Sequence, residues 1–278
     1  MNETEKFLFD LQGFIVVREF LSNEEVVALN NAFDANWDKR YEDPNRDPSG
    51  NMAALKTRDI FTGMLTWNQP HCQPFRDLLA HRKLIPYLDT LHGRGWKLDH
   101  EPFMLTGNKG MEGLTLHGTT NVYFNGSRFY AYSNSQIRCG LLVVQYALHD
   151  QKTGDGGLCV VPGSHKANFH CPKDITTWEA HQEVVHQVSL KAGDMVIFSE
   201  NTLHGSLPWQ AKYERRALLY RYTPKYLHYD GGTYNVTQPD WVTELIEAQQ
   251  AVLEPPYIYH HPLIEADGET VVRPRRED

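Results

Sequence analysis

The sequence has 278 residues, of which 41% are hydrophobic and 22% are charged, as in an ordinary globular protein. The formal net charge of −8 disfavours a nucleic-acid or anionic-membrane partner. No signal-peptide pattern, no uncharged apolar run of the roughly 20 residues that span a bilayer and no CxxC spacing occur, so a soluble, cytoplasmic protein is expected.

The first third of the chain predicts helices around a single strand. Residues 13–21 alternate and are rich in β-branched side chains, which predicts a strand. Ser22 and Glu25 form a capping-box pattern, and apolar residues at helical spacing continue from there to Phe33. Residues 40–52 form a polar loop, and residues 74–93 predict one or two helices that end at Gly93.

From about Trp96 the pattern changes to short apolar runs that are separated by turn residues. Runs of this length, rich in Val, Leu, Tyr and Phe, indicate a β-sandwich or barrel. We therefore predict one domain over 1–278, in which the helical N-terminal third packs on a jelly roll from about 96 to 226. A helix near 239–253 and an irregular end follow it. The apolar runs are 113–124, 139–150, 156–166, 183–190, 192–200 and 215–224.

Three polar residues stand at the ends of these runs in an order that suggests a metal site. His117 lies in one predicted strand, His204 follows the run 192–200, and Arg215 comes eleven residues later. Two histidines and a carboxylate on one face bind Fe(II) and leave three positions for a chelating 2-oxo acid and O2. An arginine inside the barrel can hold the far carboxylate of that acid, with the Ser206 hydroxyl beside it.

The choice of arginine and of a further pocket residue rests on strand parity. Arg215 and Arg216 are adjacent, so they point to opposite faces of a strand. Arg215 shares its face with the small Ala217 and is therefore the predicted co-substrate ligand. Gln145 points inward by the same parity and is predicted to help bind the co-substrate.

The chain resembles the phytanoyl-CoA dioxygenase family of Fe(II)/2-oxoglutarate-dependent oxygenases. The segments that carry this resemblance are "GFIVVREFLSNEEVVAL", "GDGGLCVVPGSHK" and the block "AGDMVIF…HGS…RRALLYRY". The resemblance implies a double-stranded β-helix (a cupin-like jelly roll), with His117 and His204 as metal ligands and Arg215 and Ser206 as 2-oxoglutarate ligands. It also implies Fe(II), 2-oxoglutarate and O2 as cofactor and co-substrates, with oxidation of a small molecule and release of succinate and CO2.

The sequence departs from the family at the third metal ligand. The family has an aspartate two residues after the first histidine, and Thr119 stands there in this chain. The family usually has asparagine–glycine where this chain has Asp155–Gly156, so Asp155 is the predicted replacement. Asp150, Glu200 and His149 are further candidates for this ligand.

Two different functions also fit the sequence. Related halogenases carry Ala or Gly at the position of Thr119 and bind halide there, although threonine is bulkier than either. A redox-inactive jelly-roll binding protein is the second of these functions, and the retained Arg215 and Ser206 argue against it. The substrate and the oligomeric state are not defined by the sequence.

Overall fold

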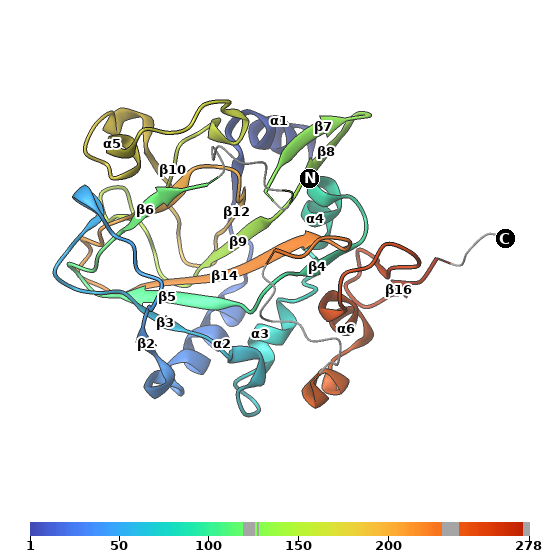
Figure 1. The fold of residues 1–278 in the computed structure, drawn as a ribbon. Coiled ribbons are helices and arrows are strands. Elements are labelled where there is room, and N and C mark those ends of the chain that lie inside the picture. Colours follow the sequence, from blue (N-terminus) through green and yellow to red (C-terminus); the bar gives the residue numbers. More distant parts are fainter. Residues whose placement is uncertain (119–125, 127, 230–238, 275–278) are drawn as a thin grey trace.

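The computed structural model describes residues 1–118, 126, 128–229 and 239–274. An eight-stranded and a four-stranded antiparallel sheet lie against each other, and helices cover the outer face of the larger sheet (Figure 1). This arrangement agrees with the predicted mainly β fold with flanking helices. Within the described ranges, no helix combines the length and the apolar composition that crossing a bilayer requires.

The larger sheet has the order β1-β12-β9-β14-β5-β3-β2, and β4 also pairs with β14. Its central strands β9 and β14 are almost entirely buried, since one face meets the helices and the other meets the smaller sheet. The strands are β1 Phe14–Val17, β2 Tyr41–Glu42, β3 Asp59–Phe61, β4 Trp96–Leu98, β5 Phe103–Gly107, β9 Leu142–Ala147, β12 Met195–Ser199 and β14 Arg215–Pro224.

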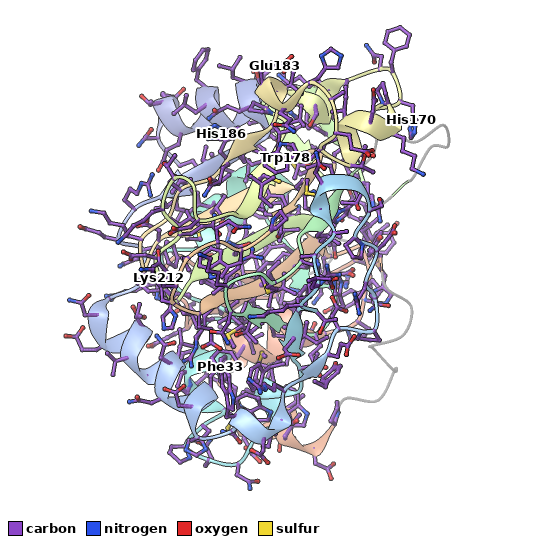
Figure 2. All side chains as sticks on the ribbon, turned by 90° about the vertical axis from the view of Figure 1, so that its left-hand side faces the viewer. Phe33, His170, Trp178, Glu183, His186 and Lys212 are labelled. Atoms are coloured by element: carbon purple, nitrogen blue, oxygen red, sulfur yellow. The ribbon has the colours of Figure 1, made fainter. Side chains whose placement is uncertain are left out.

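The smaller sheet has the order β11-β10-β13-β6. Leu158 of β10 packs with Val143, Phe198 and Leu219 of the larger sheet, so an apolar layer fills the space between the two sheets. Trp178 (labelled in Figure 2) packs against a second core cluster, which consists of Met52, Leu116, Cys159 and Leu207. The strands are β6 Leu114–His117, β10 Gly157–Val160, β11 His186–Gln187 and β13 His204–Leu207, and two separate hairpins are β7 Tyr130–Ser133 with β8 Gln136–Cys139 and β15 Leu263–Ile264 with β16 Val271–Val272.

Two of the helices, α2 and α3, pack together beside the larger sheet through an aromatic cluster. The Phe33 ring meets Trp67 and Phe75 edge to face, with ring centroids 5.7 and 4.9 Å apart (Figure 2). This geometry is favourable for aromatic pairs. The helices are α1 Glu3–Gln12, α2 Asn23–Asp34, α3 Gln73–Asp77, α4 Ile85–His92, α5 Lys173–Thr176 and α6 Glu247–Leu253.

Several elements differ from the predicted ones at their ends. β1 stops at Val17 because Glu19 adopts a φ of 51° and its amide donates to Asp194. Helix α2 begins as predicted, with both hydrogen bonds of the capping box between Ser22 and Glu25. Residues 74–93 contain two helices, α3 and α4, and Gly93 terminates the second. Helix α1 and the β7–β8 hairpin are elements that the sequence pattern does not predict.

One glycine permits the close contact of β13 with β6. A Cβ on Gly205 would lie 2.4 Å from the Leu114 carbonyl oxygen, which belongs to the backbone and cannot turn away. We therefore expect Gly205→Ala to push the strands apart and to lower the free energy of unfolding by about 1–3 kcal/mol. Thermal unfolding measures the loss of stability. Fe(II) titration tests whether His204, displaced with its strand, still binds the metal. Gly154→Ala, where a Cβ meets open space but φ is +88°, should also lose some stability through backbone strain, yet it should retain metal affinity.

Candidate metal and co-substrate site

The two predicted metal-binding histidines lie directly opposite each other on neighbouring strands. β6 ends at His117, β13 begins at His204, and the antiparallel register pairs the two residues. Side chains of directly paired residues lie on the same face of a sheet. Their ring centroids are accordingly 4.2 Å apart, and both rings line one pocket.

Backbone carbonyls determine which nitrogen of each ring carries the proton. His117 Nδ1 lies 3.0 Å from the Thr115 oxygen, and His204 Nδ1 lies 2.7 Å from the Thr202 oxygen. A carbonyl oxygen only accepts, so Nδ1 is the donor in both rings and Nε2 of the neutral ring keeps its lone pair. Metal-ligating histidines are held in this way through their second nitrogen.

Glu200 supplies a carboxylate beside this histidine pair. It follows β12 in the turn in which the Thr202 amide donates to the Ser199 carbonyl, 2.8 Å away. Glu200 Oε2 lies 3.8 Å from His204 Nε2, and one ligand atom each from Glu200, His117 and His204 lie within 4.8 Å of one another. Oε2 is buried and has no hydrogen-bond partner among the described residues. An acceptor in that position suits a cation.

The charge states of this cluster also suit a metal ion. Burial alone would raise the pKa of Glu200, but His204, Arg221 and His117 hold it below its ordinary value. Burial, together with the neighbouring His117, lowers the pKa of His204 to about 3. At neutral pH the cluster therefore contains a carboxylate and a neutral His204, the forms that bind metal.

Arg215 is buried without an acidic partner. Its Nη1 donates to the Ser206 hydroxyl at 3.1 Å, whereas Nε and Nη2 have no hydrogen-bond partner among the described residues. Burial lowers the pKa of the guanidinium to about 10, so it remains a cation at neutral pH. A buried charge with unused donors is costly unless an anion accepts from them. The two free N–H groups therefore fit a carboxylate.

All of these groups face a single pocket of about 630 Å³. Ser206 lies two residues beyond His204 on β13, so the arginine end and the histidine end are about 7 Å apart along the strand. Gln145 also lines the pocket, from β9, where it pairs with Leu219 of β14. The donors fit Fe(II) at one end and the carboxylate of a 2-oxo acid at the other.

Asp155, the predicted carboxylate ligand, is not brought to the histidines. Its Oδ2 accepts from the Lys152 amide at 2.8 Å and from the Tyr213 hydroxyl, so the carboxylate closes its own turn. It does not line the pocket. An aspartate before a glycine satisfies the turn backbone in this way, and the carboxylate that lies beside the histidines is instead that of Glu200.

His149 and Asp150 are likewise bonded to backbone groups outside the histidine pair. His149 Nδ1 lies 2.8 Å from the Glu214 carbonyl, and Asp150 accepts from the Ala192 amide. Thr119 lies outside the described residues. Arg216 faces away from Arg215, as predicted, and contacts Asp34 of helix α2 at 2.5 Å.

The pocket also contains residues that the sequence motifs do not identify. His100, Arg128 and Arg221 line the pocket from three segments. Arg221 shares the inward face of β14 with Arg215 and Leu219, so strand parity alone would have indicated its direction. His100 and Arg128 lie in loops, where no periodicity predicts direction.

Residues 9–217, more than half of the chain, match the phytanoyl-CoA dioxygenase (PhyH) family. No curated protein matches the sequence. Among solved structures, HygX from Streptomyces hygroscopicus with nickel, 2-oxoglutarate and hygromycin B bound is 19% identical, with a TM-score of 0.67. That match covers 82% of this chain and 89% of HygX.

Two further structures share the fold. The 2-oxoglutarate-dependent carbocyclase SnoK from nogalamycin biosynthesis is 16% identical, with a TM-score of 0.61 over 93% of this chain and 94% of its own. EctD from S. alaskensis, with 2-oxoglutarate and 5-hydroxyectoine, is 20% identical, with a TM-score of 0.59 over 81% of this chain and 76% of its own. These likenesses confirm the predicted cupin-like jelly roll. The chain belongs to the phytanoyl-CoA dioxygenase family and is an Fe(II)/2-oxoglutarate-dependent enzyme of the oxygenase type.

Proposed function

We propose that this protein oxidises a small molecule, by hydroxylation or a related reaction, with conversion of 2-oxoglutarate to succinate and CO2. The observation that carries the proposal is the cluster of His117, Glu200 and His204 in the same pocket as Arg215, whose Nε and Nη2 have no hydrogen-bond partner among the described residues. Iron, when bound with 2-oxoglutarate and O2, supplies the oxidising chemistry.

In this proposal His117 and His204 bind iron through Nε2, and Glu200 binds through Oε2. The carboxylate would offset part of the charge of Fe(II) beside the buried His204. Glu200 thereby takes the place of the aspartate that the family has two residues after the first histidine. It reaches the metal from the β12–β13 turn rather than from β6.

At the other end of the pocket Arg215 and Ser206 hold the far carboxylate of 2-oxoglutarate. The planar guanidinium offers Nε and Nη2 to that carboxylate, and Ser206 keeps the group in place through Nη1. Apolar side chains such as Val143, Leu158 and Phe198 also line the pocket.

The substrate is a small molecule, as is supported by the pocket volume of about 630 Å³, within the range of small-ligand sites. The HygX structure contains hygromycin B with nickel and 2-oxoglutarate, and the EctD structure contains 5-hydroxyectoine with 2-oxoglutarate, which supports the same substrate class here. A halogenase-like function loses support because Glu200 supplies a carboxylate beside the two histidines. The cluster and the free Arg215 donors likewise disfavour a redox-inactive binding protein.

Anaerobic titration with Fe(II) and then 2-oxoglutarate should produce the weak visible charge-transfer band of the chelate. Admission of O2 should then give succinate. If the protein retains neither iron nor 2-oxoglutarate, it is instead a redox-inactive binding protein.

Glu200→Gln keeps the side-chain size but removes the charge, so we expect Fe(II) affinity to fall by at least tenfold, about 1.4 kcal/mol. Asp155→Asn is the matched control, since Asp155 only closes a turn, and its iron affinity should equal that of the unaltered chain. Titration with an iron-sensitive chelator measures both variants. The opposite result would make Asp155 the ligand.

Arg215→Lys keeps the positive charge but loses the planar pair of donors. We expect 2-oxoglutarate affinity to fall by at least tenfold, about 1.4 kcal/mol, with iron affinity unchanged. Arg216→Lys serves as control, because Arg216 contacts helix α2 outside the pocket. Equal affinities in both variants would remove Arg215 from the co-substrate site.

A further inference from the structure

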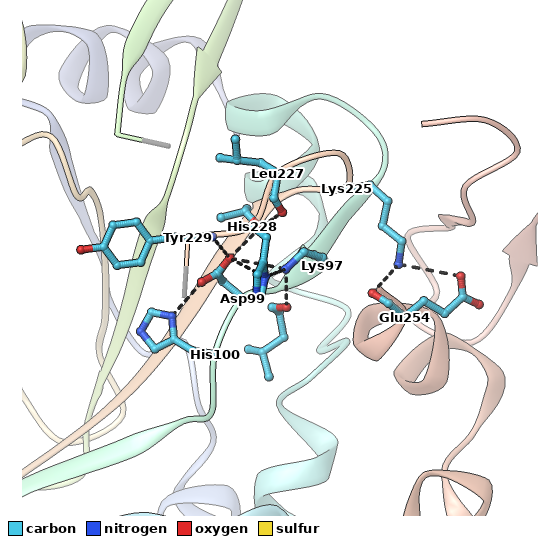
Figure 3. A network of polar contacts seen from close by, with 10 residues as sticks. Lys97, Asp99, His100, Lys225, Leu227, His228, Tyr229 and Glu254 are labelled. Atoms are coloured by element: carbon cyan, nitrogen blue, oxygen red, sulfur yellow. Dashed lines mark hydrogen bonds and ion pairs between the residues drawn. The ribbon is translucent and has the colours of Figure 1, made fainter. Parts of the chain in front are cut away.

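A buried aspartate organises the pocket wall opposite the co-substrate end. Asp99 follows β4, is fully buried, and accepts from His100 Nδ1 at 2.9 Å and from the Tyr229 amide at 2.8 Å (Figure 3). Lys97 Nζ lies 3.4 Å from the same carboxylate, and the Thr223 hydroxyl lies 3.3 Å from it. Asp99 therefore joins β4, β14 and the segment after β14.

The carboxylate of Asp99 is ionised at neutral pH. Burial alone would raise its pKa, but the hydrogen bonds from His100 and from the Tyr229 amide, with Lys97 nearby, hold the pKa below its ordinary value. An ionised carboxylate only accepts hydrogen bonds. His100 Nδ1 must therefore carry the proton of this bond, and Nε2 of the neutral ring keeps a lone pair.

His100 lines the pocket, and Nε2 is the ring nitrogen that is not bonded to Asp99. Its ring lines the pocket and lies away from the Lys97 end of the network (Figure 3). The side chain is 15% exposed, and no hydrogen bond to its Nε2 is found among the described residues. The Tyr229 ring, 6.1 Å away between centroids, flanks it. The wall thus presents an acceptor that is held in a fixed direction.

The polar neighbours of His100 differ in whether they can donate or accept hydrogen bonds in the pocket. The Glu101 carboxylate, the next residue in the chain, also lines the pocket and is a second acceptor when it is ionised. Arg128 is engaged with Tyr229: its Nη2 donates to the Tyr229 hydroxyl, and its guanidinium lies 4.8 Å from the ring centroid. The segment between β4 and β5 is therefore complementary to a hydrogen-bond donor.

We propose that His100, oriented by Asp99, recognises the substrate by accepting a hydrogen bond at Nε2 from a hydroxyl or amino group. This inference rests on the proposed function, because the ligand is the molecule that the metal site oxidises. Asp99 is a positioning residue, since it acts only through His100. The recognised group lies at the pocket wall away from Arg215, so the co-substrate and the substrate are held by different ends of the pocket.

Nitrogen NMR of the full chain at pH 8 tests the direction of the hydrogen bond without any iron chemistry. In the metal-free chain His100 should show a protonated Nδ1 and an unprotonated Nε2. The probes are 3-phenylpropan-1-ol, 3-phenylpropan-1-amine and the methyl ether of the alcohol, which share one apolar part. The alcohol, the amine or both should shift the Nε2 resonance, and the ether should not.

The probe that shifts Nε2 identifies the recognised group as hydroxyl or amine. A proton on Nε2, an equal shift with the ether, or no shift with either donor at saturating concentration would overturn the proposal. Because these spectra need neither iron nor 2-oxoglutarate, a failure here is distinguishable from a failure of the proposed function, which the Fe(II) and 2-oxoglutarate titrations test separately.

Variants separate recognition from a purely structural role. His100→Phe keeps a ring but has no acceptor, so affinity for the effective probe should fall roughly threefold to tenfold, with 2-oxoglutarate affinity unchanged. His100→Gln, which retains an acceptor oxygen, should recover part of that loss. His181→Phe, at an exposed histidine, is the matched control. Equal probe affinities in all three variants would refute the role of His100.

Asp99→Asn gives an independent test of the positioning role. The asparagine amide can donate to His100 Nδ1, so the proton should move to Nε2. The protonated amine, which can only donate, should then no longer shift that resonance. If the buried Lys97 prevents this variant from folding, the His100 variants still decide the question. An unchanged tautomer in folded Asp99→Asn would exclude Asp99 as the positioning residue.

Discussion

The pairing of β6 with β13 is the constraint on which the candidate site depends. The register places His117 against His204, and a slip of one residue would turn one of the rings to the opposite face of the sheet. Gly205 permits the required backbone approach, because any side chain there would meet the Leu114 carbonyl. Carbonyls of the same two segments then hold each Nδ1, so strand pairing also directs the metal-binding nitrogens.

Two buried charged side chains, each with atoms that have no hydrogen-bond partner among the described residues, lie on either side of that pairing. Glu200 has an unbonded oxygen beside the histidines, and Arg215 has two unbonded donors beside Ser206. Each is unfavourable in a protein interior when it stands alone. A divalent cation at the first and a carboxylate at the second would satisfy both, which accounts for their presence in one water-poor pocket. The separation of about 7 Å along β13 lets one small dicarboxylic acid reach both ends.

The pocket is also asymmetric in its hydrogen bonding. Arg215 and Ser206 present donors at one end, whereas His100 presents an acceptor at the wall. The accepting character of His100 arises from Asp99, which is buried and bonded on several sides, so the ring has little freedom to exchange its proton between nitrogens. Such an arrangement orients a molecule by the polarity of its groups as well as by its shape.

The sequence alone determined the parts of this protein that depend on local pattern. Apolar runs predicted the strands, the Ser22–Glu25 box predicted where α2 begins, and the ordered His117, His204 and Arg215 predicted one site. The carboxylate beside the histidines could not be predicted in this way, because the side chain of a turn residue follows no strand or helix periodicity. Asp155 satisfies its own turn, and only the fold of residues 199–202 brings Glu200 to the histidines. The tertiary structure likewise decided the direction of His100, since that depends on contacts with Asp99 and Tyr229 from distant segments.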